Sequence, residues 1–213
     1  MEQHLSFEYQ ARYNKIGTLS PDGELWFVLH GYGQLSPYFI NKFQFLADRG
    51  HCVIAPEGLN RFYLRGFSGR VGATWMTKEG RLQDIENYVN YLSEIYRLET
   101  ANVDCAINIL GFSQGTATVS RWIAQTDIHY DRLFIWAGIF PEDLDLNQAI
   151  PRFANKPIYF AYGKDDIFIT KGRLAGHYRV VESLKIEPVL YEFEGEHEID
   201  EATILQIMGY DAK

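Results

Sequence analysis

One segment strongly restricts the folds open to this chain: an apolar run leads through a glycine-flanked serine into a helical pattern. The run ends in the pentapeptide Gly-Phe-Ser-Gln-Gly at 111–115, and the residues after it are first small and then apolar at helical spacing. A strand that turns this sharply into a helix exposes the serine at its carboxyl end. The pattern therefore predicts a strand–turn–helix unit with Ser113 as a candidate nucleophile.

A second Gly-Phe-Ser tripeptide lies at 66–68, but its context differs. Its following glycine, Gly69, comes one place too early, and the residues before it are polar and basic. Since the surroundings of the motif give it its chemistry, we expect Ser68 to be a loop serine.

The rest of the chain alternates between apolar runs and helical patterns, which is typical of a parallel sheet covered on both faces. The first two strands flank the turn at 20–23 and are expected to form an antiparallel hairpin at the sheet edge. Residues 59–77 show no clear periodicity. We expect one domain over 1–213. Strands are predicted at 5–16, 24–30, 52–57, 103–110, 132–137, 157–162 and 189–193, and helices at 37–49, 78–97, 114–125, 172–184 and 198–207.

Composition excludes several classes of partner. The 213 residues carry a formal charge of −8, which disfavours nucleic acid or an anionic membrane. No signal peptide and no apolar run long enough for a membrane helix are visible, so a cytoplasmic location is expected. The two cysteines lack the spacing of a metal site. Nothing in the sequence indicates an oligomeric state.

A serine nucleophile of this kind needs an acid and then a histidine later in the chain. His197 follows a predicted strand and Gly195, which suits the base, whereas His177 lies in a helical pattern and is expected to pack. Asp165 and Asp166 follow the strand at 157–162. Adjacent side chains diverge, so we expect one of them to orient His197 and the other to cap a turn.

The oxyanion of an acyl intermediate needs backbone N–H donors. The residue after the nucleophile, Gln114, supplies one. The loop His30-Gly31-Tyr32-Gly33 follows an early strand, and we assign the second donor to the N–H of Tyr32. His30 is expected to be structural.

These pieces together resemble the phospholipase/carboxylesterase group of α/β-hydrolases, which includes the small acyl-protein thioesterases. The matching segments are LHGYG, APEG, ATWM, GFSQG, YGKDDIFI and EGEHEI, from Trp26 to Ile207. The resemblance implies an α/β-hydrolase fold without a large cap, no metal and no cofactor. It also implies that Asp166, three residues after a glycine, is the acid. The chain departs from the family where Tyr162 replaces a histidine and Phe168 replaces a proline.

The long stretch at 59–77 is the second functional candidate, since long loops are often binding elements. Our hypothesis is that Trp75 and Met76 line an acyl pocket and that Arg65 or Arg70 receives an anionic group. The alternative is a solvated basic loop packed by its aromatic residues.

The sequence thus predicts a serine hydrolase that cleaves carboxylic esters with small to medium acyl groups through an acyl-enzyme. A thioesterase, a lysophospholipase-type enzyme or an amide hydrolase could use the same site. A binding protein that retains the fold without turnover is the alternative from another class.

Overall fold

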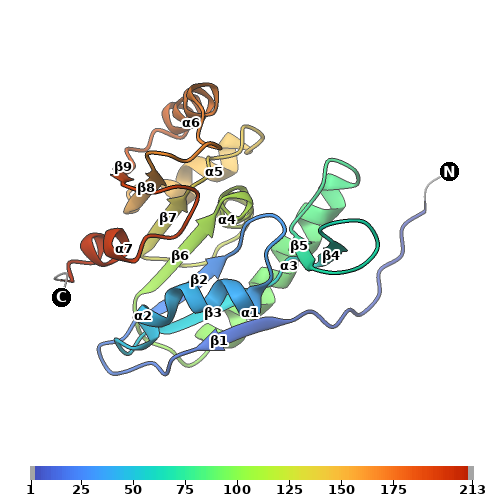
Figure 1. The fold of residues 1–213 in the computed structure, drawn as a ribbon, viewed down its shortest axis with the longest axis horizontal. Helices are drawn as coiled ribbons and strands as arrows, with labels where there is room; N and C mark the ends of the chain where they lie inside the picture. The colour runs from blue at the N-terminus through green and yellow to red at the C-terminus, as the bar shows by residue number, and fades with distance from the viewer. Residues whose placement is uncertain (1–2, 211–213) are drawn as a thin grey trace.

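The computed structural model describes residues 3–210, which fold around a seven-stranded sheet in the order β1-β3-β2-β6-β7-β8-β9 (Figure 1). β1 is antiparallel to β3, and all other neighbours are parallel. The strands of this sheet are β1 Tyr13–Ile16, β2 Leu25–Leu29, β3 Cys52–Pro56, β6 Ile107–Phe112, β7 Arg132–Trp136, β8 Ile158–Gly163 and β9 Val189–Phe193. The helices are α1 Ser36–Phe39, η1 Ile40–Phe43, α2 Gln44–Ala47, α3 Arg81–Thr100, α4 Gln114–Gln125, α5 Leu146–Phe153, α6 Lys171–Leu184 and α7 Glu201–Ile207.

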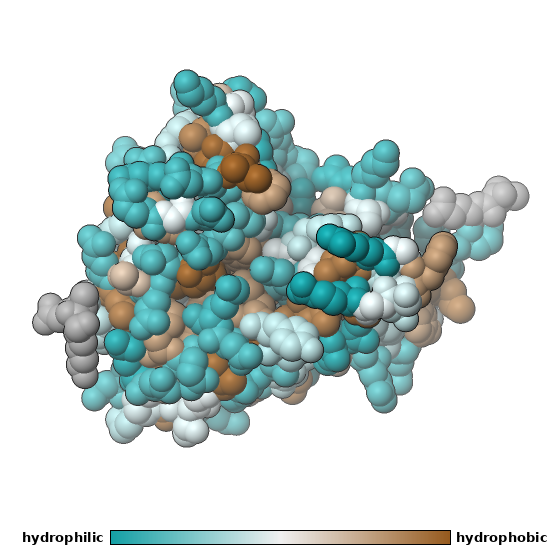
Figure 2. Space-filling view, in the orientation of Figure 1, coloured by the Kyte–Doolittle hydropathy of each residue, from teal (hydrophilic) through white to brown (hydrophobic). Residues whose placement is uncertain are grey.

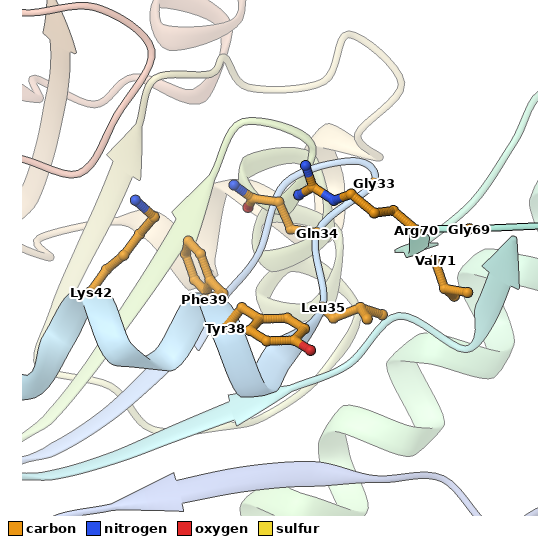
Figure 3. Close-up of a pocket in the computed structure, with 9 residues that line it drawn as sticks. All are labelled: Gly33, Gln34, Leu35, Tyr38, Phe39, Lys42, Gly69, Arg70 and Val71. Carbon is orange, nitrogen blue, oxygen red and sulfur yellow. The ribbon is translucent and has the colours of Figure 1, made fainter. Parts of the chain in front are cut away.

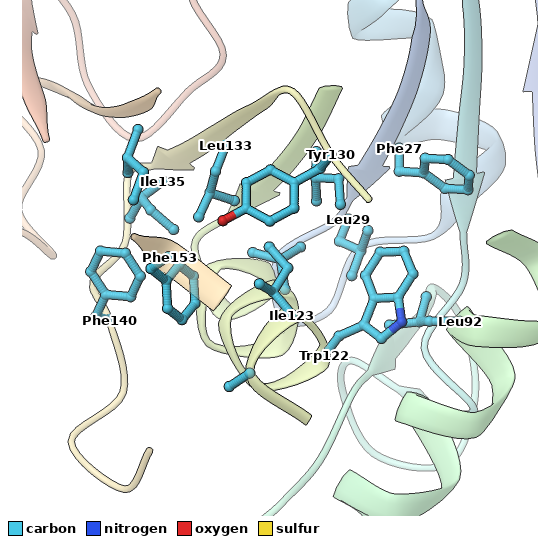
Figure 4. Close-up of a cluster of buried hydrophobic side chains, with 14 of the residues drawn as sticks. Phe27, Leu29, Leu92, Trp122, Ile123, Tyr130, Leu133, Ile135, Phe140 and Phe153 are labelled. Atoms are coloured by element: carbon cyan, nitrogen blue, oxygen red, sulfur yellow. The ribbon is translucent and has the colours of Figure 1, made fainter. Parts of the chain in front are cut away.

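Strand alternation divides the core into two layers, one on each face of the sheet. In β2, Phe27 points toward α3 and α4, whereas Trp26 points toward α1, η1 and α2. The first layer, part of which Figure 4 shows, also receives side chains from α5 and α6, and the second receives them from α7. This is the doubly covered, mostly parallel α/β arrangement that the sequence predicts.

The expected N-terminal hairpin is wrong in its pairing. β1 pairs with β3, with Tyr13 opposite Pro56, while β2 has β3 on one side and β6 on the other. β2 is buried along its whole length and so needs a partner at both edges, whereas β1 is only half-buried and suits the edge of the sheet. The strand predicted from residue 5 begins at Tyr13.

Other differences are local. The helix predicted at 37–49 is divided into α1, η1 and α2, and α5 was not predicted. Residues 59–77 contain a two-stranded antiparallel sheet, β4 Asn60–Tyr63 and β5 Val71–Thr74. β4 is largely exposed, so it lacks the apolar alternation that marks a strand in the sequence.

The face of the molecule drawn in Figure 2 is mostly hydrophilic, with smaller hydrophobic areas between the polar side chains. No helix in the described part of the chain is long and apolar enough to cross a bilayer. Cys52 is buried and Cys105 half-buried, and both are free thiols.

Candidate active site

The candidate site lies where the strand order reverses. The chain passes from β2 to β3 on one side and later returns to β6 on the other side of β2. In an open parallel sheet, the loops after the carboxyl ends of such strands border a crevice. The loop after β2 and the turn after β6 are the segments that contain Tyr32 and Ser113.

Ser113 occupies a strained turn directly after β6. Its backbone has φ 54° and ψ −113°, and its N–H donates to the Trp136 oxygen at 2.8 Å. A Cβ at Gly111 would lie 2.5 Å from the Gly115 oxygen, and one at Gly115 would lie 2.3 Å from the Leu29 oxygen. The two glycines of the motif therefore let β6, α4 and β2 pack closely around the serine.

Ser68 lies elsewhere, in the exposed turn between β4 and β5. The prediction that it is a loop serine is confirmed. Neither a buried strand before it nor a helix after it supports a nucleophile at this position.

His197 and Asp166 form a close pair after β9 and β8. The Nδ1 atom of His197 lies 2.7 Å from Oδ2 of Asp166, and Oδ1 of Asp166 accepts the N–H of Phe168 at 2.8 Å. The Asp166 side chain is fully buried, whereas that of His197 is 22% exposed. Because a carboxylate accepts at Nδ1, this nitrogen carries the proton and Nε2 is left as the basic atom.

Aromatic contacts hold the His197 ring beside the turn after β6. Its centroid lies 4.9 Å from that of Phe112, the chain neighbour of Ser113, and 4.7 Å from that of Phe168. The imidazole therefore lies between the segment that carries the serine and the segment that carries the acid.

The backbone around the two loops is packed too closely for any side chain at Gly163. A Cβ there would lie 2.3 Å from the carbonyl oxygens of both Gly195 and Glu196. The N–H of Asp165 donates to the Gly195 oxygen at 3.0 Å, so the aspartate loop and the histidine loop are joined directly. Asp165 itself is exposed, and it is Asp166 that contacts His197.

The loop after β2 lies against the serine. A Cβ at Gly31 would lie 3.1 Å from the Ser113 Cβ. The N–H of Gly31 donates to Oε1 of Gln34, and that of Gly33 donates to the Ala73 oxygen in β5. By contrast, the N–H groups of Tyr32 and Gln114 have no partner among residues 3–210. The Tyr32 side chain is exposed and packs on Phe62.

His30 is structural, as expected. Its Nε2 accepts the N–H of Gly58 at 3.0 Å, and its Nδ1 lies 2.7 Å from the Gly31 oxygen. Complete burial lowers the pKa of His30 to about 4, so the ring is neutral near pH 7.

The acyl-pocket hypothesis needs a correction at Trp75. Its side chain is 1% exposed, packs against His30 and Tyr88, and donates Nε1–H to the His30 oxygen. Trp75 is therefore a core residue without surface for a substrate. Met76 is half-buried, and its carbonyl accepts from Nε2 of Gln114. Residues 74–76 thus brace the helix that begins at Gln114.

The two arginines of the same hypothesis, Arg65 and Arg70, lie in different surroundings. Arg70 lines an open cleft beside the loop after β2, whereas Arg65 is exposed in the turn between β4 and β5 (Figure 3). Sequence reasoning did not identify Gln34 and Lys42, which line the same cleft. It also did not identify Glu57, although a glutamate at the end of a buried strand is an unusual residue that could have drawn attention.

Within residues 3–210, no group of three or more His, Cys, Asp or Glu side chains could hold a metal ion. The chemistry available at this site is that of a hydroxyl, an imidazole, a carboxylate and backbone N–H groups.

Sequence comparison finds no matching family model and no significantly similar curated protein. Solved structures do match. Esterase PE8 aligns over 94% of this chain and 97% of its own with TM-score 0.68 and 18% identity. Acyl-protein thioesterase 2 of Zea mays aligns over 94% of this chain and 97% of its own, with TM-score 0.71 and 16% identity. The Bacillus cereus carboxylesterase aligns over 93% of this chain and 92% of its own, with TM-score 0.65 and 11% identity. These likenesses show the α/β-hydrolase fold, in agreement with the resemblance carried by the sequence motifs.

Proposed function

We propose that this protein is a serine hydrolase of the phospholipase/carboxylesterase type that cleaves carboxylic esters with small to medium acyl groups. The observation that carries the proposal is the 2.7 Å pair between His197 and Asp166, whose imidazole packs on Phe112 directly before the strained Ser113. The combination of elbow, imidazole and buried carboxylate is the constellation of nucleophilic acyl transfer.

In the proposed acylation step, the Ser113 hydroxyl attacks the ester carbonyl while Nε2 of His197 accepts its proton. A bond forms between Oγ and the carbonyl carbon, and the tetrahedral intermediate then loses the alcohol. His197 returns the proton to the leaving oxygen. The Asp166 carboxylate keeps the proton of the neutral imidazole on Nδ1 and stabilises the imidazolium that forms during each transfer.

The developing oxyanion would be bound by the N–H groups of Tyr32 and Gln114. Both are free of other partners among the described residues, and Gln114 begins α4, whose N-terminus favours negative charge. The hydrogen bonds of Gly31 and Gly33 to Gln34 and Ala73 fix the loop and leave Tyr32 as its available donor. Water, activated by His197, then hydrolyses the acyl-enzyme.

The structurally similar proteins include both a carboxylesterase and a thioesterase, so they do not decide whether the leaving atom is oxygen or sulfur. The same arrangement of side chains can attack the carbonyl of an oxyester or of a thioester. A matched oxyester and thioester with one acyl group would rank the two, and the proposal expects turnover of the oxyester.

Ester turnover in two matched serine variants tests the proposal. With 4-nitrophenyl butyrate, Ser113→Ala is expected to lose at least ~10³-fold in kcat because the nucleophile is removed. Ser68→Ala, in the other Gly-Phe-Ser, is expected to keep wild-type kcat. Undiminished turnover by Ser113→Ala would overturn the proposal. A wild-type protein that is stabilised by the ester without cleaving it would indicate a binding protein instead.

A further inference from the structure

An open cleft of about 550 Å³ lies beside the loop that carries the proposed oxyanion donor (Figure 3). Gly33 and Gln34, which directly follow Tyr32, form part of its wall, and Phe39 in the wall packs on Phe112 at a centroid distance of 5.8 Å. The cleft therefore adjoins the loop of the proposed oxyanion donor, while Ser113 and His197 themselves are outside its lining. Its lining comprises Gly33, Gln34, Leu35, Tyr38, Phe39, Lys42, Gly69, Arg70 and Val71.

The charged groups in this lining are all positive. Lys42 lies in η1, and Arg70 directly precedes β5. No Asp or Glu belongs to the lining. Neither cation forms an ion pair with any residue of 3–210. In a chain of formal charge −8, two unpaired cations on one cleft are a local reversal of sign.

Several arginines elsewhere on the molecule are paired with carboxylates. Arg12 and Arg61 both bind Glu57, Arg121 binds Asp143 and Arg132 binds Glu24. The absence of a carboxylate partner thus distinguishes the cleft from these other sites.

A neutral donor adds to the two cations. Oε1 of Gln34 accepts the Gly31 N–H, which orients the amide so that Nε2 is free to donate. In Figure 3, the Arg70 side chain extends toward Gln34, and Lys42 rises from the helical segment beside Phe39. Leu35 and Val71 add apolar surface to the lining of the same cleft.

Surface of this kind fits a short apolar chain that ends in an anion. We propose that the cleft binds a carboxylate carried by the ester substrate, so that the preferred substrates are esters with a free carboxylate on the acyl or the alcohol part. The inference rests on the proposed hydrolysis at Ser113 and adds the substrate class. Guanidinium and amide donors suit a planar carboxylate. The aliphatic part of the substrate next to that carboxylate contacts the apolar wall of the cleft.

The covalent chemistry is unchanged by this anion. The bond between Ser113 Oγ and the carbonyl carbon forms, the ester C–O bond breaks, and the serine proton passes through His197 to the leaving alcohol. The remote carboxylate remains ionised and is only bound, so its contribution is expected in KM and in kcat/KM.

Matched ester pairs test the proposal. Mono-4-nitrophenyl adipate against 4-nitrophenyl hexanoate places the carboxylate on the acyl side. 3-Butyryloxybenzoate against its methyl ester places it on the alcohol side. We expect kcat/KM to favour the anionic member of at least one pair by about tenfold, the ratio that 1.4 kcal/mol supplies. High salt should reduce that preference, because exposed charges are screened.

Charge-neutral variants locate the effect. Lys42→Gln/Arg70→Gln is expected to abolish the preference while retaining turnover of the neutral esters. Lys78→Gln/Lys171→Gln, which removes two exposed positive charges outside the cleft lining, is the matched control and should keep it. Stability of each variant is checked by thermal unfolding.

The outcomes separate the two proposals. Turnover of neutral esters without any anionic preference, or a preference that survives in Lys42→Gln/Arg70→Gln, overturns the cleft assignment and leaves the hydrolase. Failure of wild-type protein to cleave any of the four esters contradicts the proposed function itself.

Discussion

Ser113 is a non-glycine residue with a positive φ of 54°, a conformation that costs on the order of 1 kcal/mol or more. Its surroundings enforce that conformation. The N–H is held by Trp136, and the hydroxyl of Thr116 donates to the Ser113 oxygen at 2.7 Å. Strain of this kind is retained at functional sites because the neighbouring structure over-determines it.

The adjacent aspartates Asp165 and Asp166 provide a matched test of which carboxylate orients His197. The sequence leaves Asp165 and Asp166 as alternatives, and the resemblance alone selects Asp166. The buried side chain at 166 contacts His197, whereas Asp165 is exposed. We predict that Asp166→Asn lowers kcat by ~10³- to 10⁴-fold, since an amide at this position favours the wrong imidazole tautomer.

Asp165→Asn is the control for this experiment and should stay within about twofold of wild type, a bound set by its exposure and lack of contact with the imidazole. The measurement is steady-state hydrolysis of 4-nitrophenyl butyrate. Equal losses in the two variants would contradict the assignment of the acid.

Among the elements, Glu57 is the point where four segments meet at the end of β3. Its carboxylate binds Arg12 before β1, Arg61 in β4, and both the N–H and the hydroxyl of Ser36 at the start of α1. The next residue, Gly58, donates to His30. Glu57 therefore joins the N-terminal segment, the hairpin and α1 to the base of the proposed oxyanion loop.

We predict that Glu57→Gln lowers the free energy of unfolding by about 1–3 kcal/mol, because one amide cannot replace the charged hydrogen bonds to two arginines. The measurement is urea unfolding at pH 7. Glu94→Gln is the matched control: its pair with Arg97 is exposed, so a change within about 0.5 kcal/mol is expected. Equal stabilities of wild type and Glu57→Gln would contradict this role.

Elements with strong local signals were predictable from the sequence. The predicted bounds of α4 and β9 coincide with those observed, because glycines or apolar runs mark their ends. The hairpin β4–β5 was missed because its strands are short and β4 is exposed. The pairing of β1 depends on contacts with β3, about forty residues away, which no local pattern encodes.

The residues of the site likewise divide into those that local sequence marks and those that only the tertiary structure brings together. Ser113 and His197 could be selected because each follows a strand in a recognisable loop. The cleft residues Gln34, Lys42 and Arg70 come from three separate segments, and their proximity is a property of the tertiary structure. Trp75 was misassigned because an aromatic residue in a long loop reads as pocket lining, whereas burial of its ring decides otherwise.

For the molecule as a whole, we expect a loss of stability in mild acid, because two buried histidines are neutral in the folded protein. Burial lowers the pKa of both His30 and His177 to about 4, from 6.5. Between these pH values, the unfolded chain binds more protons than the folded one. The free energy of unfolding therefore falls as pH falls from 6.5 toward 4, by up to about 1.4 kcal/mol per pH unit for each histidine.

His177, which lies in α6, provides the test because its aromatic and hydrogen-bond contacts involve none of Ser113, Asp166 and His197. Its ring stacks on Phe160 and Phe140, and its Nε2 has no hydrogen-bond partner among the described residues. In His177→Gln, the loss of stability between pH 6.5 and 4 should be smaller than in wild type by up to about 3 kcal/mol. Tyr178→Phe, the adjacent exposed position, should keep the wild-type slope. Parallel stability curves for wild type and His177→Gln would contradict the prediction.

The proposed function requires that Ser113 is an activated nucleophile. The most direct measurement treats the folded protein with a fluorophosphonate probe and maps the adduct by peptide mass spectrometry. We expect covalent label on Ser113, and we expect labelling to be greatly slowed in His197→Ala because the base that activates the hydroxyl is removed. Label on Ser68, or no label on a protein verified as folded, would contradict it.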